Sequence, residues 1–114
     1  MRVKVLEKDV QRQILDYLSL KKVWHCRLNS GASLLHDGSD GKPRRFIRYG
    51  APGLPDILAR TKTGTVIWIE CKSTIGKLSK DQEKWKEDSD RFGDIFITAR
   101  CLEDVQVLFE GRVK

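Results

Sequence analysis

The residues most able to do chemistry in this 114-residue chain are two carboxylates and a lysine at short spacing. Asp56 follows Pro55, and Glu70 and Lys72 lie further along, separated by Cys71. Carboxylate oxygens are hard ligands that suit Mg²⁺ or Mn²⁺, ions that keep bound waters which a substrate phosphate can replace. A nearby lysine stabilises negative charge on such a phosphate. These residue types and spacings predict a divalent-cation site beside a phosphate ester.

The sequence predicts a tight β-hairpin that brings the two carboxylates together. Two stretches rich in β-branched and large apolar residues, 55–60 and 65–72, flank a Thr-Lys-Thr-Gly sequence that ends at Gly64. Gly64 fits the left-handed position of a three-residue loop built as a type I turn with a G1 bulge. The resulting register places Asp56 directly opposite Glu70 on one face, with Cβ atoms about 4.5–5.5 Å apart. A two-residue loop or a one-residue slip would instead turn Asp56 to the other face.

The alternation of side chains along a strand places Lys72 on the face of Glu70 and leaves Cys71 only its backbone carbonyl to offer. Two close carboxylates repel each other unless one is protonated or a cation neutralises them. Simpler explanations exist, because Asp after Pro is common in turns and a Glu and a Lys two apart can form a solvated strand edge. However, these charges interrupt an apolar run, 66–69, that is typical of a strand buried on both faces. Charges there are costly without a partner or a metal.

Glu7 is a third candidate carboxylate. Apolar residues at helical spacing predict a helix over about 6–20, and Glu7 projects into the middle of its apolar stripe. An acid in the first helical turn is also favoured by the helix dipole and can lie in water. Gln11 lies at the edge of the same stripe and is a weaker candidate. The stripe consists of Val10, Ile14, Tyr17 and Leu18.

Gln82 has two possible roles. Ser79 and Gln82 have the spacing of a capping box at the start of a second helix, in which Gln82 bonds back to the backbone of Ser79. Gln82 also shares a helical face with Trp85, Ser89 and Phe92, so the same glutamine could face the carboxylates.

The remaining pattern gives the organisation of the chain. It predicts a strand at about 23–28, a loop over 29–43, a helix over 79–92 ended by Gly93, a buried strand at 94–98 and a last helical element around 102–109. In the first strand, Trp24, Cys26 and Leu28 alternate with polar residues. The order αβββαβα is that of an α/β sandwich, in one domain that spans residues 1–114.

The chain is basic, with 22 lysines and arginines against 16 acidic residues and a formal net charge of +6. This balance favours an anionic partner. One basic group lies just ahead of the predicted hairpin and is expected to bind nucleic-acid phosphates: Lys42, Arg44, Arg45 and Arg48. A second group surrounds the second helix, where neighbouring acids dilute its charge, so that a solvated face explains it more readily than it explains the first group: Lys77, Lys80, Lys84 and Lys86.

The three cysteines, an odd number without a CxxC motif, argue against a disulfide framework and for a reducing compartment. We expect Cys26, Cys71 and Cys101 to be small core residues. A zinc site from His25, Cys26 and His36 is conceivable, but its spacing fits no common pattern. Since the sequence has no membrane-spanning or signal-like apolar run, a soluble cytoplasmic protein is expected.

In five segments taken in order, the chain resembles the PD-(D/E)XK nucleases, with Pro55-Asp56 and Glu70-Cys71-Lys72 as the two halves of their motif. More narrowly, it resembles the VRR-Nuc family in its small stand-alone form, of phage or bacterial type. The segments cover nearly the whole chain apart from residues 32–45. They are Glu7, Arg-Leu-Asn-Ser-Gly at 27–31, Gly-Ala-Pro-Gly-Leu-Pro-Asp at 50–56, Ile-Glu-Cys-Lys at 69–72, and Leu-Ser-Lys-Asp-Gln at 78–82 leading to Trp85.

This resemblance implies a restriction-endonuclease-like αβββαβ core, with a mixed central sheet flanked by helices. It implies a Mg²⁺- or Mn²⁺-dependent deoxyribonuclease acting on branched DNA such as Holliday junctions or flaps. A homodimer would match the two-fold symmetry of a junction. Two alternatives are a non-catalytic nucleic-acid-binding module and a sequence-specific restriction-type endonuclease. The implied metal ligands are Asp56, Glu70, the Cys71 carbonyl and, through water, Glu7; Lys72 and Gln82 complete the implied catalytic site.

Overall fold

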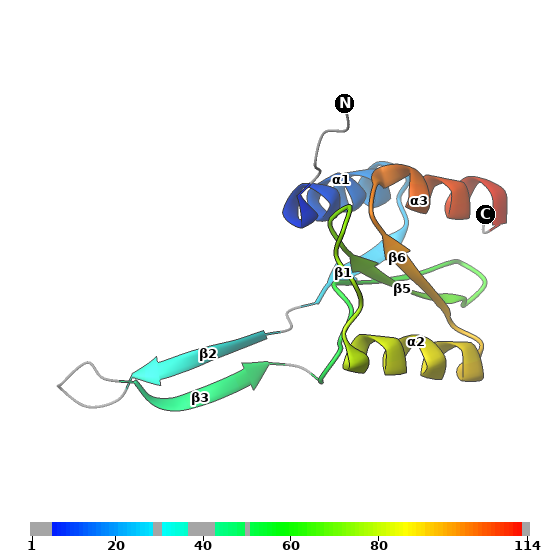
Figure 1. The fold of residues 1–114 in the computed structure, drawn as a ribbon. Helices are drawn as coiled ribbons and strands as arrows, with labels where there is room; N and C mark the ends of the chain where they lie inside the picture. The colour runs from blue at the N-terminus through cyan, green and yellow to red at the C-terminus, as the bar shows by residue number, and fades with distance from the viewer. Residues whose placement is uncertain (1–5, 29–30, 37–42, 50, 113–114) are drawn as a thin grey trace.

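The protein was analysed as a computed structural model that describes residues 6–28, 31–36, 43–49 and 51–112 (Figure 1). Its elements are α1 (Glu7–Leu20), β1 (Trp24–Arg27), β2 (Gly31–His36), β3 (Pro43–Tyr49), β4 (Ile57–Arg60), β5 (Val66–Cys71), α2 (Lys80–Phe92), β6 (Ile95–Ala99), α3 (Leu102–Val107) and a π-helical segment, η1 (Leu108–Arg112). No helix among the described residues is both long enough and apolar enough to span a membrane.

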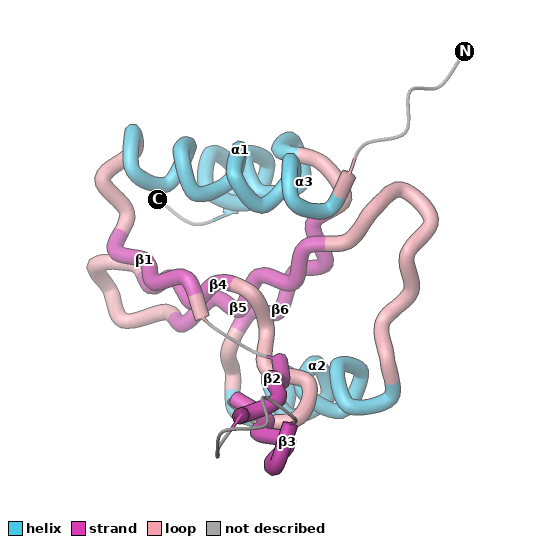
Figure 2. The backbone as a smooth tube through the Cα atoms, turned by 90° about the vertical axis from the view of Figure 1, so that its left-hand side faces the viewer, coloured by secondary structure: helices cyan, strands magenta, loops and turns pink. Residues whose placement is uncertain are grey.

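A four-stranded mixed sheet forms the centre of the fold. Its strand order is β1-β4-β5-β6, in which only the β5–β6 pair is parallel. Helices α1 and α3 cover one face of the sheet and α2 covers the other (Figure 2). The protein is therefore an α/β sandwich, as expected, and the order of these elements is compatible with an αβββαβ core.

The core lies between α1 and the sheet. The predicted stripe of α1 is buried, and it packs with the inward residues of β4 and β5. A helix whose apolar residues recur at this spacing must bury that face to be stable, because an isolated helix of this length is marginal in water. The core side chains that are completely buried include Val10, Ile14, Leu18, Ile57, Ile67 and Ile69.

The β4–β5 hairpin has the predicted loop and register. Ile57 pairs with Ile69, and Arg60 pairs with Val66. Gly64 has a φ of 92° and donates its N–H to the carbonyl of Thr61 at 3.1 Å, which closes the type I turn. Since this conformation favours glycine, Gly64 fixes the loop length and therefore the face on which each side chain lies.

The predicted loop over residues 29–43 is wrong where the structure describes it, at residues 31–36 and 43. Residues Gly31–His36 form β2, which pairs antiparallel with β3, Pro43–Tyr49, and these two strands make a separate sheet. The hairpin projects away from the α/β body (Figure 1). The glycine and serine content of this segment indicated a loop, but strand formation depends more on cross-strand partners than on intrinsic preference. The observed order thus contains two strands more than the sequence predicted.

The prediction that Cys26, in β1, is a core residue is also wrong. Trp24 is 48% exposed and Cys26 is exposed, whereas Val23 packs against the core. Alternation along a strand defines two faces but does not tell which one is buried, and β1 lies at the edge of the sheet. Of the three cysteines, only Cys71 is fully buried, and Cys101 is partly buried.

Candidate metal centre

Three carboxylates converge at one end of the sheet. Glu7 comes from the first turn of α1, Asp56 from the bend that precedes β4, and Glu70 from the end of β5. One oxygen of each lies within 4.8 Å of an oxygen of the other two. Within the described residues, this is the only group of three or more such acidic, histidine or cysteine side chains. It contains the three acids that the sequence singled out.

Asp56 is held in place by its own backbone and by β5. Its N–H donates to the carbonyl of Ile69 at 3.1 Å, and its carbonyl accepts from the N–H of Leu28 at 2.7 Å. The carboxylate oxygen Oδ2 accepts a hydrogen bond from the backbone N–H of Cys71 at 2.8 Å. The Asp56 side chain thus accepts the hydrogen bond of a β5 N–H just before β4 begins, and its Oδ2 is occupied by this structural bond.

Glu70 is 3% exposed, and its two oxygens differ sharply. Oε1 accepts a hydrogen bond from Gln82 Nε2 at 3.1 Å and lies 3.8 Å from Lys72 Nζ. Oε2 is buried and has no hydrogen-bond partner among the described residues. Burial, followed by the negative charge of Asp56, raises the pKa of Glu70 to about 8, although Lys72 opposes this rise. Without a cation, folding therefore favours the neutral form of this acid.

These residues fit a divalent cation. An unsatisfied buried polar atom costs about 1–3 kcal/mol, and Oε2 of Glu70 is such an atom. Lys72 supplies one positive charge against three acids, so an added cation would both offset the repulsion and complete the coordination of Oε2. Carboxylate oxygens favour Mg²⁺ or Mn²⁺ over softer metals.

Cys71 contributes no thiolate to this centre. Its side chain is completely buried, and desolvation strongly raises the pKa of its thiol, so the sulfur is protonated. Its N–H is already donated to Asp56. Coordination by its backbone carbonyl stays a prediction.

Gln82 performs both of its predicted roles. Its Oε1 accepts from the N–H of Ser79 at 2.9 Å, and Ser79 Oγ accepts from the N–H of Gln82 at 3.2 Å, which together form the capping box. The remaining amide nitrogen donates to Glu70. The rest of the expected face is less uniform, because Ser89 is buried but Phe92 is 74% exposed. The Gln82 side chain thus links the N-terminal cap of α2 to the carboxylate of Glu70.

Two residues near the centre were not identified from the sequence as positioning groups. Gly53 has a φ of 79°, and a Cβ built there would lie 2.4 Å from the backbone oxygen of Asp81. The turn before Asp56 therefore packs closely on the first turn of α2. Gly53 itself, two residues before Pro55, could have indicated this contact from the sequence, since glycine commonly marks a close approach of two backbones.

Arg100 is the second such residue. Its Nη1 donates to the carbonyls of Ser73 at 2.8 Å and Gly76 at 2.6 Å, in the connection that follows Lys72. The guanidinium thus fixes the chain directly after the lysine of the site. Nothing in the sequence pattern pointed to this contact, which joins distant parts of the chain.

No protein-family model, curated protein or solved structure matches this chain. The resemblance to the VRR-Nuc family therefore rests on the sequence segments alone.

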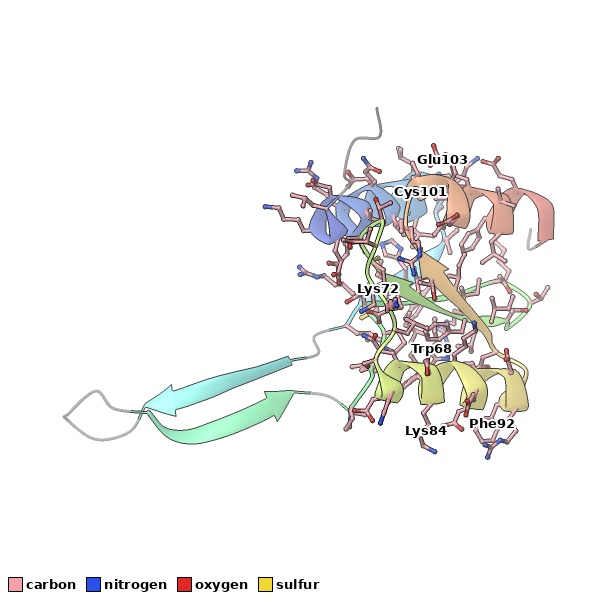
Figure 3. The ribbon with its side chains drawn as sticks, in the orientation of Figure 1. Trp68, Lys72, Lys84, Phe92, Cys101 and Glu103 are labelled. Carbon is pink, nitrogen blue, oxygen red and sulfur yellow. The ribbon has the colours of Figure 1, made fainter. Side chains whose placement is uncertain are left out.

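The basic residues divide into two groups in the structure. Arg44, Arg45 and Arg48 lie on β3, in the hairpin that leaves the body on the side where α1 and α2 begin (Figure 1). Lys42 lies outside the described residues. The lysines of the second group are all exposed. Lys84, a member of this group, points away from the sheet (Figure 3). Lys72 of the candidate centre lies instead between the helical layers.

The alternative zinc site gains no support from its described members. His25 Nδ1 lies 2.8 Å from the carbonyl oxygen of Val23, a hydrogen-bonding contact. Cys26 is exposed, and its sulfur donates to the carbonyl of Arg27 at 3.5 Å. The side chain of His36 lies outside the described part of the structure.

Proposed function

We propose that this protein is a Mg²⁺- or Mn²⁺-dependent nuclease that hydrolyses DNA phosphodiester bonds. The observation that carries the proposal is Glu70, a buried carboxylate whose Oε2 lacks a partner and which lies within 4.8 Å of the carboxylates of Glu7 and Asp56. A second support is Lys72, whose Nζ lies 3.8 Å from Glu70 Oε1, where its charge can also stabilise a phosphate held at the metal. The sequence resemblance points to the same chemistry.

The residues have distinct roles in this proposal. Glu7, Asp56 and Glu70 would hold the metal, which when bound polarises a phosphoryl oxygen and lowers the pKa of a coordinated water. The Cys71 N–H orients Asp56, and Gln82 orients Glu70, so that neither carboxylate has to reorganise when substrate arrives.

Lys72 acts on the substrate side of the centre. Its side chain is 15% exposed, and its Nζ lies 3.8 Å from Glu70 Oε1, so the lysine is confined but not sealed from solvent. In the proposed reaction its ammonium positions the attacking water or, through its charge, favours ionisation of that water, and it stabilises the negative charge that develops on the phosphate.

The direct test is cleavage of labelled DNA with Mg²⁺ or Mn²⁺. Wild type, Asp56→Ala and Glu70→Ala are compared with Asp90→Ala, which removes an exposed acid of α2. We expect the first two variants to lose at least about a hundredfold in rate and the control to retain wild-type rate. Absence of cleavage by wild type, or equal cleavage by all variants, would contradict the proposal. DNA binding without any cleavage would instead identify a binding module.

The preferred substrate is proposed to be branched DNA, and the active form a homodimer. The support is the sequence resemblance and the projecting β2–β3 hairpin, whose β3 strand carries three arginines. Such a hairpin can contact phosphates away from the scissile bond, and phosphate contacts position DNA without reading its sequence. Comparison of linear duplex, flap, single-stranded and four-way junction substrates tests this selectivity, and sedimentation with junction DNA tests the dimer.

A further inference from the structure

A cavity lined by basic residues lies at the opposite end of the sheet from the carboxylates. Its volume is about 590 Å³, and it lies where α1 ends, β1 begins and β4 enters its turn. Asp56 precedes β4, whereas Arg60 is its last residue, so strand β4 separates the two places. The cavity therefore cannot be part of the proposed metal centre.

Four positive side chains line this cavity, and none of the lining side chains is negative. Lys21 and Lys22 follow the end of α1, where cations also offset the helix dipole. Arg60 and Lys62 come from β4 and its turn and have no such role. Glu110 is the only carboxylate that the described residues place within 4 Å of any of them, at 3.9 Å from Lys21 Nζ. The cavity is therefore suited to an anion.

Aromatic side chains form part of the same wall. Trp24 is 48% exposed, and the guanidinium carbon of Arg60 lies 4.3 Å from the centroid of its ring. Phe109 also lines the cavity and packs against the core. Cations next to exposed aromatic rings are the combination by which proteins bind single-stranded nucleic acids, because every base offers a flat face for stacking. A duplex keeps its base faces covered.

The backbone of Lys22 adds an independent observation. Its φ is 57°, and among the described residues it is the only one other than glycine with a positive φ. Its N–H donates to the Ser19 carbonyl at 3.1 Å, and the N–H of Val23 donates to the Leu18 carbonyl at 3.0 Å. This is the bonding of a Schellman motif, whose left-handed position is usually glycine. A lysine in this strained position is explained if its charge is used at the cavity.

We propose that the cavity binds a nucleotide with an unpaired base. The phosphate lies among the ammonium and guanidinium groups of Lys22, Arg60 and Lys62, and the base stacks on Trp24. The ligand is a nucleotide of a single strand or a free mononucleotide, which share this chemistry. The site does not depend on cleavage at the carboxylates.

The test uses the full chain in EDTA, so that cleavage does not interfere. Anisotropy of a fluorescein-labelled thymidine oligonucleotide of about ten residues reports binding. We expect Trp24→Ala and Arg60→Ala to weaken binding by roughly tenfold, and Arg12→Ala, which removes an exposed arginine of α1, to have no more than a small effect. Removal of Arg60 should also reduce the salt dependence of binding by about one counterion.

Lys22→Gly separates binding from folding. Glycine relieves the left-handed conformation, so we expect a higher melting temperature together with weaker oligonucleotide binding. If Trp24→Ala, Arg60→Ala and Lys22→Gly all bind the oligonucleotide as Arg12→Ala does, the proposal is wrong. It is also wrong if duplex of equal length binds as tightly and Trp24→Ala weakens neither ligand. Displacement of the oligonucleotide by thymidine monophosphate identifies a free nucleotide as a ligand, and failure of this competitor identifies the strand.

Discussion

Gln82 ties the start of helix α2 to the buried carboxylate of Glu70. The oxygen of its amide accepts from the N–H of Ser79 at 2.9 Å, while the nitrogen donates to Glu70 Oε1 at 3.1 Å. One side chain therefore caps a helix and orients a carboxylate of the candidate metal centre. The formation of the helix and the geometry of the centre are coupled through this amide.

Gln82→Glu is predicted to separate these two roles. Glutamate still caps the helix, because it occupies this place in a capping box as well as glutamine does. It cannot donate to Glu70 and adds a negative charge beside it. We expect unchanged helix content by circular dichroism, a lower melting temperature in EDTA, and DNA cleavage reduced by about tenfold or more.

Gln82→Ala is the matching control, since it removes both side-chain bonds but keeps the bond from the N–H of residue 82 to Ser79 Oγ, and it should cost about 1 kcal/mol of unfolding free energy. If Gln82→Glu cleaves DNA at the wild-type rate, Gln82 serves only the helix.

Glu70 should make the stability of the metal-free protein depend on pH. Burial and the charge of Asp56 raise its pKa from 4.5 to about 8. Folding therefore favours the neutral acid, so the contribution of Glu70 to stability is complete below about pH 4.5 and is lost as the pH rises through about 8. We expect the unfolding free energy of wild type relative to Glu70→Gln to fall by a few kcal/mol across this window, measured by urea titration in EDTA.

In Mn²⁺, the same urea titrations should show the opposite dependence of stability on pH. Metal binding requires ionised Glu70, so the stabilisation by Mn²⁺ should grow as the pH rises. A difference between wild type and Glu70→Gln that stays constant across the window in EDTA would show that the acid is not held neutral.

Gly53→Ala should be far more damaging than substitution of another glycine with positive φ. Both Gly53 and Gly64 have left-handed backbones, but a Cβ at Gly64 meets nothing within 4 Å, whereas one at Gly53 meets Asp81. We expect Gly64→Ala to cost about 1–2 kcal/mol of unfolding free energy and Gly53→Ala about 2–5 kcal/mol. Chemical denaturation measures both costs. Equal values would mean that the 51–54 turn does not contact α2 as closely as described.

Arg100→Ala should loosen the connection between β5 and α2. The side chain bonds to the carbonyls of Ser73 and Gly76, and its loss should cost about 2 kcal/mol. We expect faster tryptic cleavage after Lys77 and reduced DNA cleavage, because the chain next to Lys72 loses its anchor. Arg91→Ala removes an exposed arginine whose ion pair with Asp88 and contact with the ring of Phe92 both lie within α2, and it should leave both rates unchanged. Equal proteolysis of the two variants would contradict this role of Arg100.

The local parts of the fold were predictable from the sequence. Gly64 specified the turn, the turn specified the register of β4 against β5, and the register brought Asp56 to Glu70. Ser79 and Gly93 marked the two ends of α2 in the same way. Each of these features depends on residues close in the chain, where turn and capping chemistry act directly.

The features that were not predicted depend on contacts between distant segments. Residues 31–36, which form β2, were expected to belong to a loop, because the pairing of β2 with β3 is not visible in composition. Trp24 is exposed because of where β1 lies in the assembled sheet, at its edge, which the alternation of residues along the strand does not reveal. Likewise, the contact of Gly53 with Asp81 and the bonds of Arg100 exist only once separate elements have packed.

The β4–β5 hairpin also has a consequence for the order of folding. Contacts between neighbouring segments form more readily than distant ones, because closing a short loop costs less entropy. Asp56 and Glu70 therefore meet early, whereas Glu7 joins only when α1 docks on the sheet. The nascent hairpin must close against the repulsion of its own two acids, so if the centre binds a divalent cation as proposed, we expect that cation to speed this step as well as stabilise its product.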